Sequence, residues 1–156
     1  KDYITLQDEI RYITNYLYIQ KIRYGPKVCY EVTLEPGCEA QEVPKLILQP
    51  LVENAIYHGV KLKRGEGHLS VRVAKEGEKS IRLQVKDDGR GMEKERAEDL
   101  EKLLNEPSKP EQNRSFGLFY VKERLRIRYG DNYQVKVHSI ENEGTTVVIF
   151  IPVKEQ

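Results

Sequence analysis

The first part of the chain has hydrophobic residues at the spacing of an amphipathic helix. This spacing predicts a helix over residues 5–24, whose apolar positions are Leu6, Ile10, Ile13 and Leu17. Thr5, three residues before Asp8, has the pattern of an N-terminal cap, and Gly25-Pro26 is expected to end the helix.

Alternating apolar and polar positions predict β-strands in three regions. A single strand is expected over residues 28–34, and a hairpin over 69–85 turns at Glu76-Gly77-Glu78. A second hairpin ends the chain, with strands over 135–140 and 146–153.

Two further helices are predicted between these strands. One follows Pro44, a good first-turn proline, and runs to about His58-Gly59; apolar residues cover most of its surface, so we expect it to be buried. The other runs from Gly117 to Tyr129, and Gly130 ends it.

Residues 93–114 are rich in charge and contain two prolines near their end, so we expect a short helix followed by a mobile loop. The complete order is helix, strand, helix, hairpin, charged segment, helix, hairpin. This order favours an α+β fold, a two-layer sandwich whose mixed, mostly antiparallel sheet carries helices on one face and follows an N-terminal helix.

Composition narrows the function classes. The 156 residues suit one domain, and a net charge of +1 gives no global field that would attract nucleic acid or anionic lipid. Two cysteines, Cys29 and Cys38, exclude a disulfide scaffold and a cysteine zinc site. No apolar run approaches the ~20 residues that span a bilayer. Because the chain starts at Lys1 and has only Met92, we expect it to be part of a longer protein.

Two polar segments lie where the chain could meet a ligand. Asn54 lies inside the apolar helix, where an amide is costly unless it is used by a ligand or by a neighbouring loop. Asp87 follows a strand in the pattern D-x-G-x-G, with Gly89 and Gly91. Its carboxylate could accept a hydrogen bond from an exocyclic amine, and the glycines allow close backbone approach; the alternative is an ordinary acidic turn.

Two more segments stand beside predicted elements. Gly117 follows Ser115-Phe116 at the start of a helix, whose free N–H groups suit a phosphate; the alternative is a plain helix start. Gly144-Thr145-Thr146 enters the last strand and, taken alone, is typical of a hairpin turn.

Together, in this order, the four segments resemble the GHKL (Bergerat-fold) ATP-binding superfamily, and within it the sensor histidine kinases of the LytS/YesM type. "LQDEIRYITNYLYIQKIRYG" resembles the helix before their ATP-binding domain, and "PKLILQPLVENAIYHG" resembles their asparagine box. "VKDDGRGM" and "FGLFYVKERLRIRYGD" are similar to the two glycine boxes, and "GTTVVIFIP" to the closing strand.

The resemblance implies ATP and Mg²⁺ as cofactors and assigns roles to individual residues. Asn54 would ligate the Mg²⁺ that bridges the phosphates, and Asp87 would read the adenine amine. The nucleotide-contacting set implied is Asn54, Asp87, Gly89, Gly91, Met92, Arg114, Gly117, Leu118 and Thr145. Residues 1–26 would lead from a dimerisation and phosphoacceptor region, 27–156 would form the ATP-binding catalytic domain, and 93–114 its ATP lid.

The second glycine box is reduced, with Arg114 and Ser115 where glycines are often found, and two further positions depart from the resembled patterns. Superfamily ATPases such as gyrase, Hsp90 and MutL carry a catalytic Glu four residues before the Asn. Here Pro50 stands there, so we do not expect efficient activation of water, although the adjacent Glu53 is a candidate base. Tyr57 occupies the place where many histidine kinases carry a phosphate-binding Lys or Arg. The residues that could replace it, among which the sequence does not choose, are Lys61, Arg64 and Arg114.

None of His58, His68 and His138 lies in the Pro-His-Phe-type context of a phosphoacceptor, so we expect the acceptor outside this chain. The expected function is the cytoplasmic catalytic domain of a two-component sensor histidine kinase. It would act as a homodimer in the full-length protein, with its own phosphoacceptor domain and a response regulator, without nucleic acid, and reach a membrane only through other segments. The alternatives are a serine kinase of the anti-sigma-factor type and a non-catalytic nucleotide-binding module.

Overall fold

The computed structural model describes residues 2–107 and 116–153. In chain order the elements are β1 (Tyr3–Thr5), α1 (Leu6–Tyr24), the 3₁₀ turn η1 (Gly25–Lys27), β2 (Val28–Leu34), β3 (Glu42–Pro44), α2 (Gln49–Asn54), the π-helix η2 (Ala55–Val60), β4 (Gly67–Glu76), β5 (Ser80–Asp87), α3 (Lys94–Asn105), α4 (Phe116–Tyr129), β6 (Gln134–Ile140) and β7 (Gly144–Pro152).

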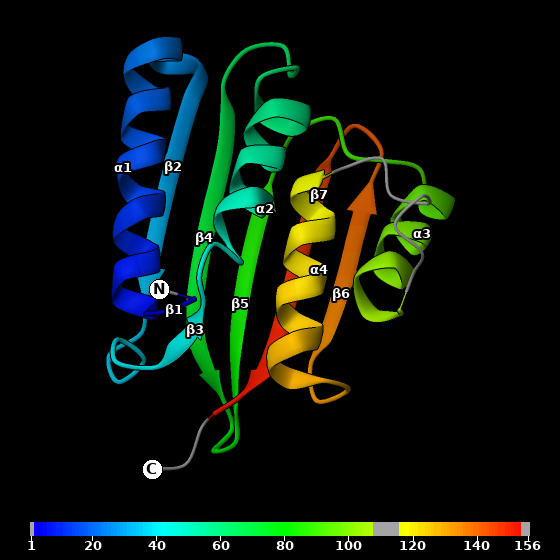
Figure 1. The fold of residues 1–156 in the computed structure, drawn as a ribbon. Coiled ribbons are helices and arrows are strands. Elements are labelled where there is room, and N and C mark those ends of the chain that lie inside the picture. The colour runs from blue at the N-terminus through cyan, green and yellow to red at the C-terminus, as the bar shows by residue number, and fades with distance from the viewer. Residues whose placement is uncertain (1, 108–115, 154–156) are drawn as a thin grey trace.

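A mixed five-stranded sheet forms one layer, in the order β2-β4-β5-β7-β6. The β2–β4 pair is parallel and the other three pairs are antiparallel. Helices α1, α2 and α4 cover one face of this sheet (Figure 1), and the core lies between the two layers. The predicted α+β sandwich with helices on one face is therefore confirmed. The short pairing of β1 with β3 was not predicted, because three-residue strands carry too little pattern.

Helix α1 begins and ends as its sequence predicts. The Thr5 hydroxyl accepts the N–H of Asp8 at 3.2 Å, and Gly25 ends the helix with a φ of +60°. On the apolar face Leu6, Ile13 and Leu17 are fully buried and Ile10 is partly buried, and Glu9 is buried with them. The Glu9 carboxylate accepts the backbone N–H groups of Leu46 and Leu48 at 3.0 and 2.9 Å, so α1 holds the segment that leads into α2.

The helix predicted to follow Pro44 begins later than expected. Pro44 instead ends β3, opposite Tyr3, and Leu46 has a φ of +64°, a left-handed conformation that no α-helix contains. The helix starts at Gln49, so Pro50 is its first-turn proline. From Ala55 it continues as a π-helix, in which the N–H of Lys61 reaches the carbonyl of Ile56 at 2.9 Å.

The first half of the charged segment forms the predicted short helix, α3, which is anchored on β6. Asn105 exchanges two hydrogen bonds of 2.7 Å with the backbone of Val135, and Glu101 accepts the N–H of Val137 at 2.8 Å. The predicted loop falls largely on residues 108–115, which include Arg114 and lie outside the described residues. Within the described ranges, no helix is long and apolar enough to cross a membrane.

Candidate functional site

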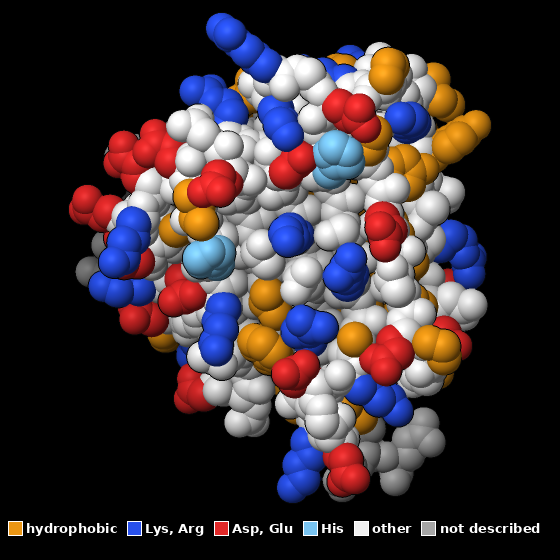
Figure 2. Space-filling view, turned by 180° about the vertical axis from the view of Figure 1, so that it is seen from behind, with side chains coloured by type: hydrophobic (Ala, Val, Ile, Leu, Met, Phe, Trp, Pro, Cys, Tyr) orange, Lys and Arg blue, Asp and Glu red, His pale blue; other side chains and the backbone are white. Residues whose placement is uncertain are grey.

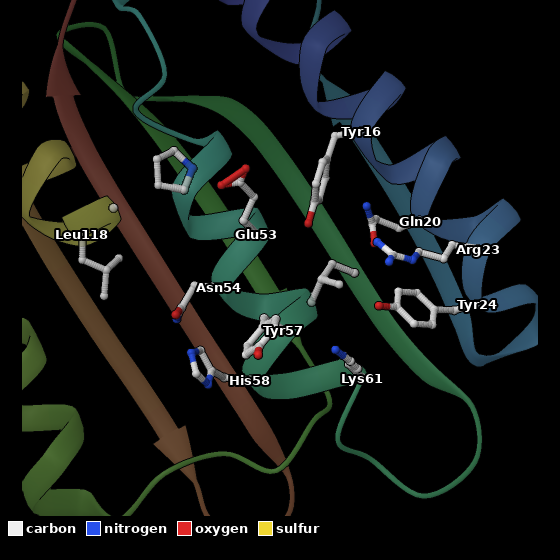
Figure 3. Close-up of a pocket in the computed structure, with 13 residues that line it drawn as sticks. Tyr16, Gln20, Arg23, Tyr24, Glu53, Asn54, Tyr57, His58, Lys61 and Leu118 are labelled. Carbon is white, nitrogen blue, oxygen red and sulfur yellow. The ribbon is translucent and has the colours of Figure 1, made fainter. Parts of the chain in front are cut away.

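Three adjoining cavities lie between the helical layer and one end of the sheet, and all three are lined by Asn54, His58 and Leu118. The helix-side cavity, about 580 Å³, lies between α1, α2–η2 and the start of α4 (Figure 3). The loop-side cavity, about 720 Å³, lies between η2, residues 90–93 and α3. The floor cavity is a small recess of about 50 Å³ above the ends of β5 and β7.

Asp87, the last residue of β5, lies at the bottom of the floor cavity with only 7% of its surface exposed. Its Oδ1 accepts the N–H of Gly89 at 2.8 Å. Burial raises the pKa of the carboxyl from 3.8 to about 6, and the charge of Asp88 adds to this, while the Gly89 N–H opposes it. A desolvated acceptor at the end of a cavity is suited to a ligand that brings its own hydrogen-bond donor.

Glycines leave the room that this carboxylate occupies. A Cβ at Gly59 would lie 2.6 Å from Asp87 Oδ1, and a Cβ at Gly89 would collide with the backbone of Gly59. Gly91 has a φ of +66°, and a Cβ there would meet the carbonyl of Ile140. The predicted glycines are thus required by packing of the site itself. Gly59 was missed, because His58-Gly59 indicated only a helix end.

Met92 and Thr145 are tied together beside Asp87. The Met92 N–H donates to Ser139 Oγ at 2.8 Å, and Ser139 Oγ lies 2.8 Å from Thr145 Oγ1. Thr145 is also the β7 partner of Asp87, and both it and Met92 line the floor cavity. The structure therefore brings these three predicted site residues together. Ser139, their connection, carries no signal in the sequence.

Asn54 stands where the three cavities meet, and its side-chain amide forms no hydrogen bond within the described parts of the chain. Within residues 2–107 and 116–153, no neighbouring loop forms a hydrogen bond with this amide. His58 lies one helical turn later and lines the same cavities. The sequence predicted only that His58 ends a helix. Its i, i+4 spacing from Asn54 could have predicted that the two side chains share one helix face.

Glu53 does not share the position of Asn54. Its side chain is exposed, accepts the amide of Gln49 at 3.4 Å, and points away from Asn54, as Figure 3 shows. Pro50 lines the same helix-side cavity and offers no carboxylate. Glu53 therefore lines the same cavity as Asn54, with its carboxylate turned away from the Asn54 amide.

The start of α4 opens on the helix-side cavity through Gly117 and Leu118. A Cβ at Gly117 would lie 3.4 Å from Pro50 Cβ, so the two helices approach closely there. The first-turn N–H groups and positive dipole end of α4 therefore lie on the same cavity as Asn54.

Basic side chains surround the two large cavities. Lys61 and Arg23 line the helix-side cavity, and Arg90 and Arg96 line the loop-side cavity. Lys61, one of the three predicted replacements for a cation at Tyr57, lies over that ring with its Nζ 4.6 Å from the ring centroid. Arg64 lines neither large cavity, and Arg114 lies outside the described residues.

Comparison with known proteins agrees with this geometry. Residues 40–155 match the family described as "Histidine kinase-, DNA gyrase B-, and HSP90-like ATPase". The chain is 29% identical over its whole length to the sensor histidine kinase YesM of Bacillus subtilis, and 32% identical over 96% of its length to the sensor histidine kinase YpdA of Escherichia coli. It spans only about a quarter of these relatives, 25% and 24% of their lengths.

Solved structures show the same fold. The mycobacterial sensor histidine kinase MprB gives a TM-score of 0.65 at 16% identity, covering 99% of this chain and 98% of that one. The nucleotide-free catalytic domain of the histidine kinase ThkA gives 0.64 at 16% identity, covering 97% and 94%. The resemblance drawn from the sequence is confirmed, and the chain belongs to the family of histidine kinase-, DNA gyrase B- and HSP90-like ATPases.

Proposed function

We propose that this domain binds Mg-ATP and donates the γ-phosphate to a histidine on a separate helical dimerisation domain, as the catalytic domain of a two-component sensor histidine kinase. The observation that carries the proposal is the buried carboxylate of Asp87 at the end of a recess, with the amide of Asn54, unpaired among the described residues, lining the same recess. One end of this arrangement suits a base with an amino group, and the other suits a metal-bound phosphate.

Adenine would occupy the floor cavity and donate its exocyclic amine to Asp87. The recess is walled by apolar side chains of α2 and β7 and by the backbone of Gly91. Its present volume of about 50 Å³ is smaller than a purine, so adenine binding requires the lining side chains to move. Met92 and Leu100 border both this recess and the loop-side cavity, so their movement would join the two. α3 is the described part of the proposed ATP lid.

Asn54 would hold Mg²⁺, and its environment fits that role. Its amide oxygen is a hard donor, has no hydrogen-bond partner in the described ranges 2–107 and 116–153, and lies between two cavities that carry Lys61, Arg90 and Arg96. Mg²⁺ commonly binds through one or two protein oxygens together with substrate phosphates and water. When bound, it would neutralise phosphate charge, while the α4 N-terminus and the basic residues orient the phosphates.

The acceptor would come from another domain. The exposed face of α1 carries large apolar side chains on one side of the helix: Tyr12 is 45%, Ile19 58% and Ile22 68% exposed. This face suits contact with a helical partner, consistent with residues 1–26 leading from such a domain. In the full-length protein the same partner would provide the homodimer contact and pass the phosphate to a response regulator.

The test supplies ATP labelled on the γ-phosphate to the chain, alone and with the helical phosphoacceptor domain of the full-length protein. We expect acid-labile label only on the added domain, and loss of that label with Asn54→Ala. Acid-stable label on a serine or threonine would overturn the proposal in favour of a serine kinase. Acid-labile label on this chain alone would overturn the placement of the acceptor outside it.

A further inference from the structure

Three side chains with metal-binding atoms gather on the face of the sheet that none of the described helices covers. Cys29 on β2 and His68 on β4 are register partners in the parallel pair, and Glu66 precedes β4 by one residue. Figure 2 shows this open face, where acidic and basic side chains intermingle. The cluster lies on the opposite side of the sheet from the helices that build the proposed nucleotide site. It is therefore not part of that site.

The donor atoms of the three side chains converge. Cys29 Sγ lies 2.8 Å from Glu66 Oε1, and His68 Nε2 lies 3.3 Å from the same oxygen. One sulfur, one nitrogen and one oxygen are all within 4.8 Å of one another. Around a tetrahedral zinc ion, bond lengths of about 2.0–2.3 Å separate neighbouring ligand atoms by about 3–4 Å, so modest side-chain rotation suffices.

We propose that Cys29, Glu66 and His68 bind a Zn²⁺ ion, with water in the fourth position. A thiolate, an imidazole and a carboxylate are the three ligand types that zinc takes in proteins. The two negative ligands balance the charge of the ion, and the neutral imidazole adds none. Two cysteines are too few for a zinc site built of cysteines alone. A mixed site with one cysteine, one histidine and one glutamate needs only Cys29.

The histidine is held in the orientation that a metal ligand needs. Asp88 Oδ2 lies 2.8 Å from His68 Nδ1, and Asp88 Oδ1 accepts the backbone N–H of His68 at 2.7 Å. With Nδ1–H donated to Asp88, the lone pair of Nε2 faces Glu66 and Cys29. This carboxylate–histidine arrangement is the usual support of a zinc-bound imidazole. Lys63 in turn holds Asp88, with Nζ 2.9 Å from Oδ2.

Access to the cluster is open. A cavity of about 290 Å³ on this face is lined by Cys29, His68 and Asp88, and the side chains of His68 and Glu66 are 60% and 58% exposed. An ion can therefore reach the three donors without rearrangement of the sheet. The fourth position faces solvent, where water can occupy it.

The test uses the intact chain and two metals. Co²⁺ titration should give thiolate-to-metal charge-transfer and tetrahedral d–d absorption, and Zn²⁺ should remove both by competition. Competition with a chromophoric chelator should give one Zn²⁺ per chain. Cys29→Ala and His68→Gln should abolish the cobalt bands and lower zinc affinity at least tenfold. The matched controls Cys38→Ala and His138→Gln change the other cysteine and an exposed histidine of β6, and should leave both measurements unchanged.

Asp88 is a positioning residue in this site, so its substitution gives a distinct result. Asp88→Asn should weaken zinc binding by about 10–100-fold while the stoichiometry and the cobalt spectrum at saturation stay the same. The proposal is overturned if no thiolate–cobalt band forms, if Cys38→Ala removes it as fully as Cys29→Ala, or if zinc binds only at millimolar concentration.

Discussion

The buried carboxylate of Asp87 should cost the free protein stability at neutral pH, and replacing it should recover that stability. Asp87→Asn keeps the size of the side chain but cannot ionise. The pKa of Asp87 is about 6 in the folded chain, against 3.8 for an unperturbed aspartate, because burial disfavours the charged form.

The sign and size of the effect follow from proton linkage. Below pH 3.8 the carboxyl is protonated in both states and contributes nothing. Between pH 3.8 and 6 the unfolded chain releases the proton while the folded chain retains it, so the free energy of unfolding falls as pH rises. The shift of about two pKa units corresponds to about 3 kcal/mol, fully developed above pH 6.

Denaturant unfolding at a series of pH values from 4 to 8 measures this term. The free energy of unfolding of Asp87→Asn minus that of the wild type should become more positive by about 2.5 kcal/mol across the series, because part of the full term is already present at pH 4. Taking the difference removes groups common to both proteins, such as Glu9, whose pKa burial also raises.

The neighbouring Asp88 provides a control of opposite sign. Burial alone would raise its pKa, but hydrogen bonds from the His68 backbone, from Lys63 and from the His68 ring outweigh it and lower the pKa. Asp88→Asn should therefore lose stability relative to the wild type as pH rises toward 3.8, a window reached by extending the series down to about pH 2. A pH-independent difference for Asp87→Asn, or the same sign for both variants, would refute the assignment of Asp87 as a desolvated carboxylate.

Three further substitutions test separate parts of the account. Glu9→Gln places an amide against backbone N–H donors, which should lower the free energy of unfolding by about 1–3 kcal/mol in denaturant titration. Asn54→Ala should weaken Mg-ATP binding in calorimetry more than metal-free ATP binding. The free energy of unfolding should change by under about 1 kcal/mol, because the Asn54 amide has no partner in the described chain. An equal loss of both affinities would make Asn54 structural. Gly59→Ala puts a methyl group beside Asp87, and should reduce nucleotide affinity at least tenfold while the far-ultraviolet circular dichroism stays native.

The sequence was informative wherever one local pattern decides the structure. The cap at Thr5, the alternating strands and the glycine that ends α1 needed no knowledge of distant residues. The start of α2 was misplaced because its beginning depends on Glu9, 40 positions before Gln49, and on the left-handed turn at Leu46. Hydrophobic periodicity reports neither a tertiary cap nor a change from α- to π-helix.

The site followed the same division. Asp87 and Asn54, which line one cavity, could be proposed from the sequence because their neighbours along the chain form recognisable motifs. Gly59 and Ser139 could not, because their importance lies in what they touch across the fold: the Asp87 carboxylate and Thr145. The cluster of Cys29 with His68 likewise exists only through the register of two strands 39 positions apart in the sequence.

The central claim is that Asp87 reads the amino group of adenine, and competition between ATP and GTP tests it most directly. Adenine presents an amine at the position where guanine presents a carbonyl oxygen, which a buried carboxylate repels. With Mg²⁺ present, calorimetry should show ATP binding to the wild type at least tenfold more tightly than GTP, in line with about 1–3 kcal/mol for an unmatched buried polar pair. Asp87→Asn, whose amide can also donate, should bind ATP more weakly and lose most of that preference. Equal affinity of the wild type for both nucleotides, or an unchanged preference in Asp87→Asn, would contradict the account.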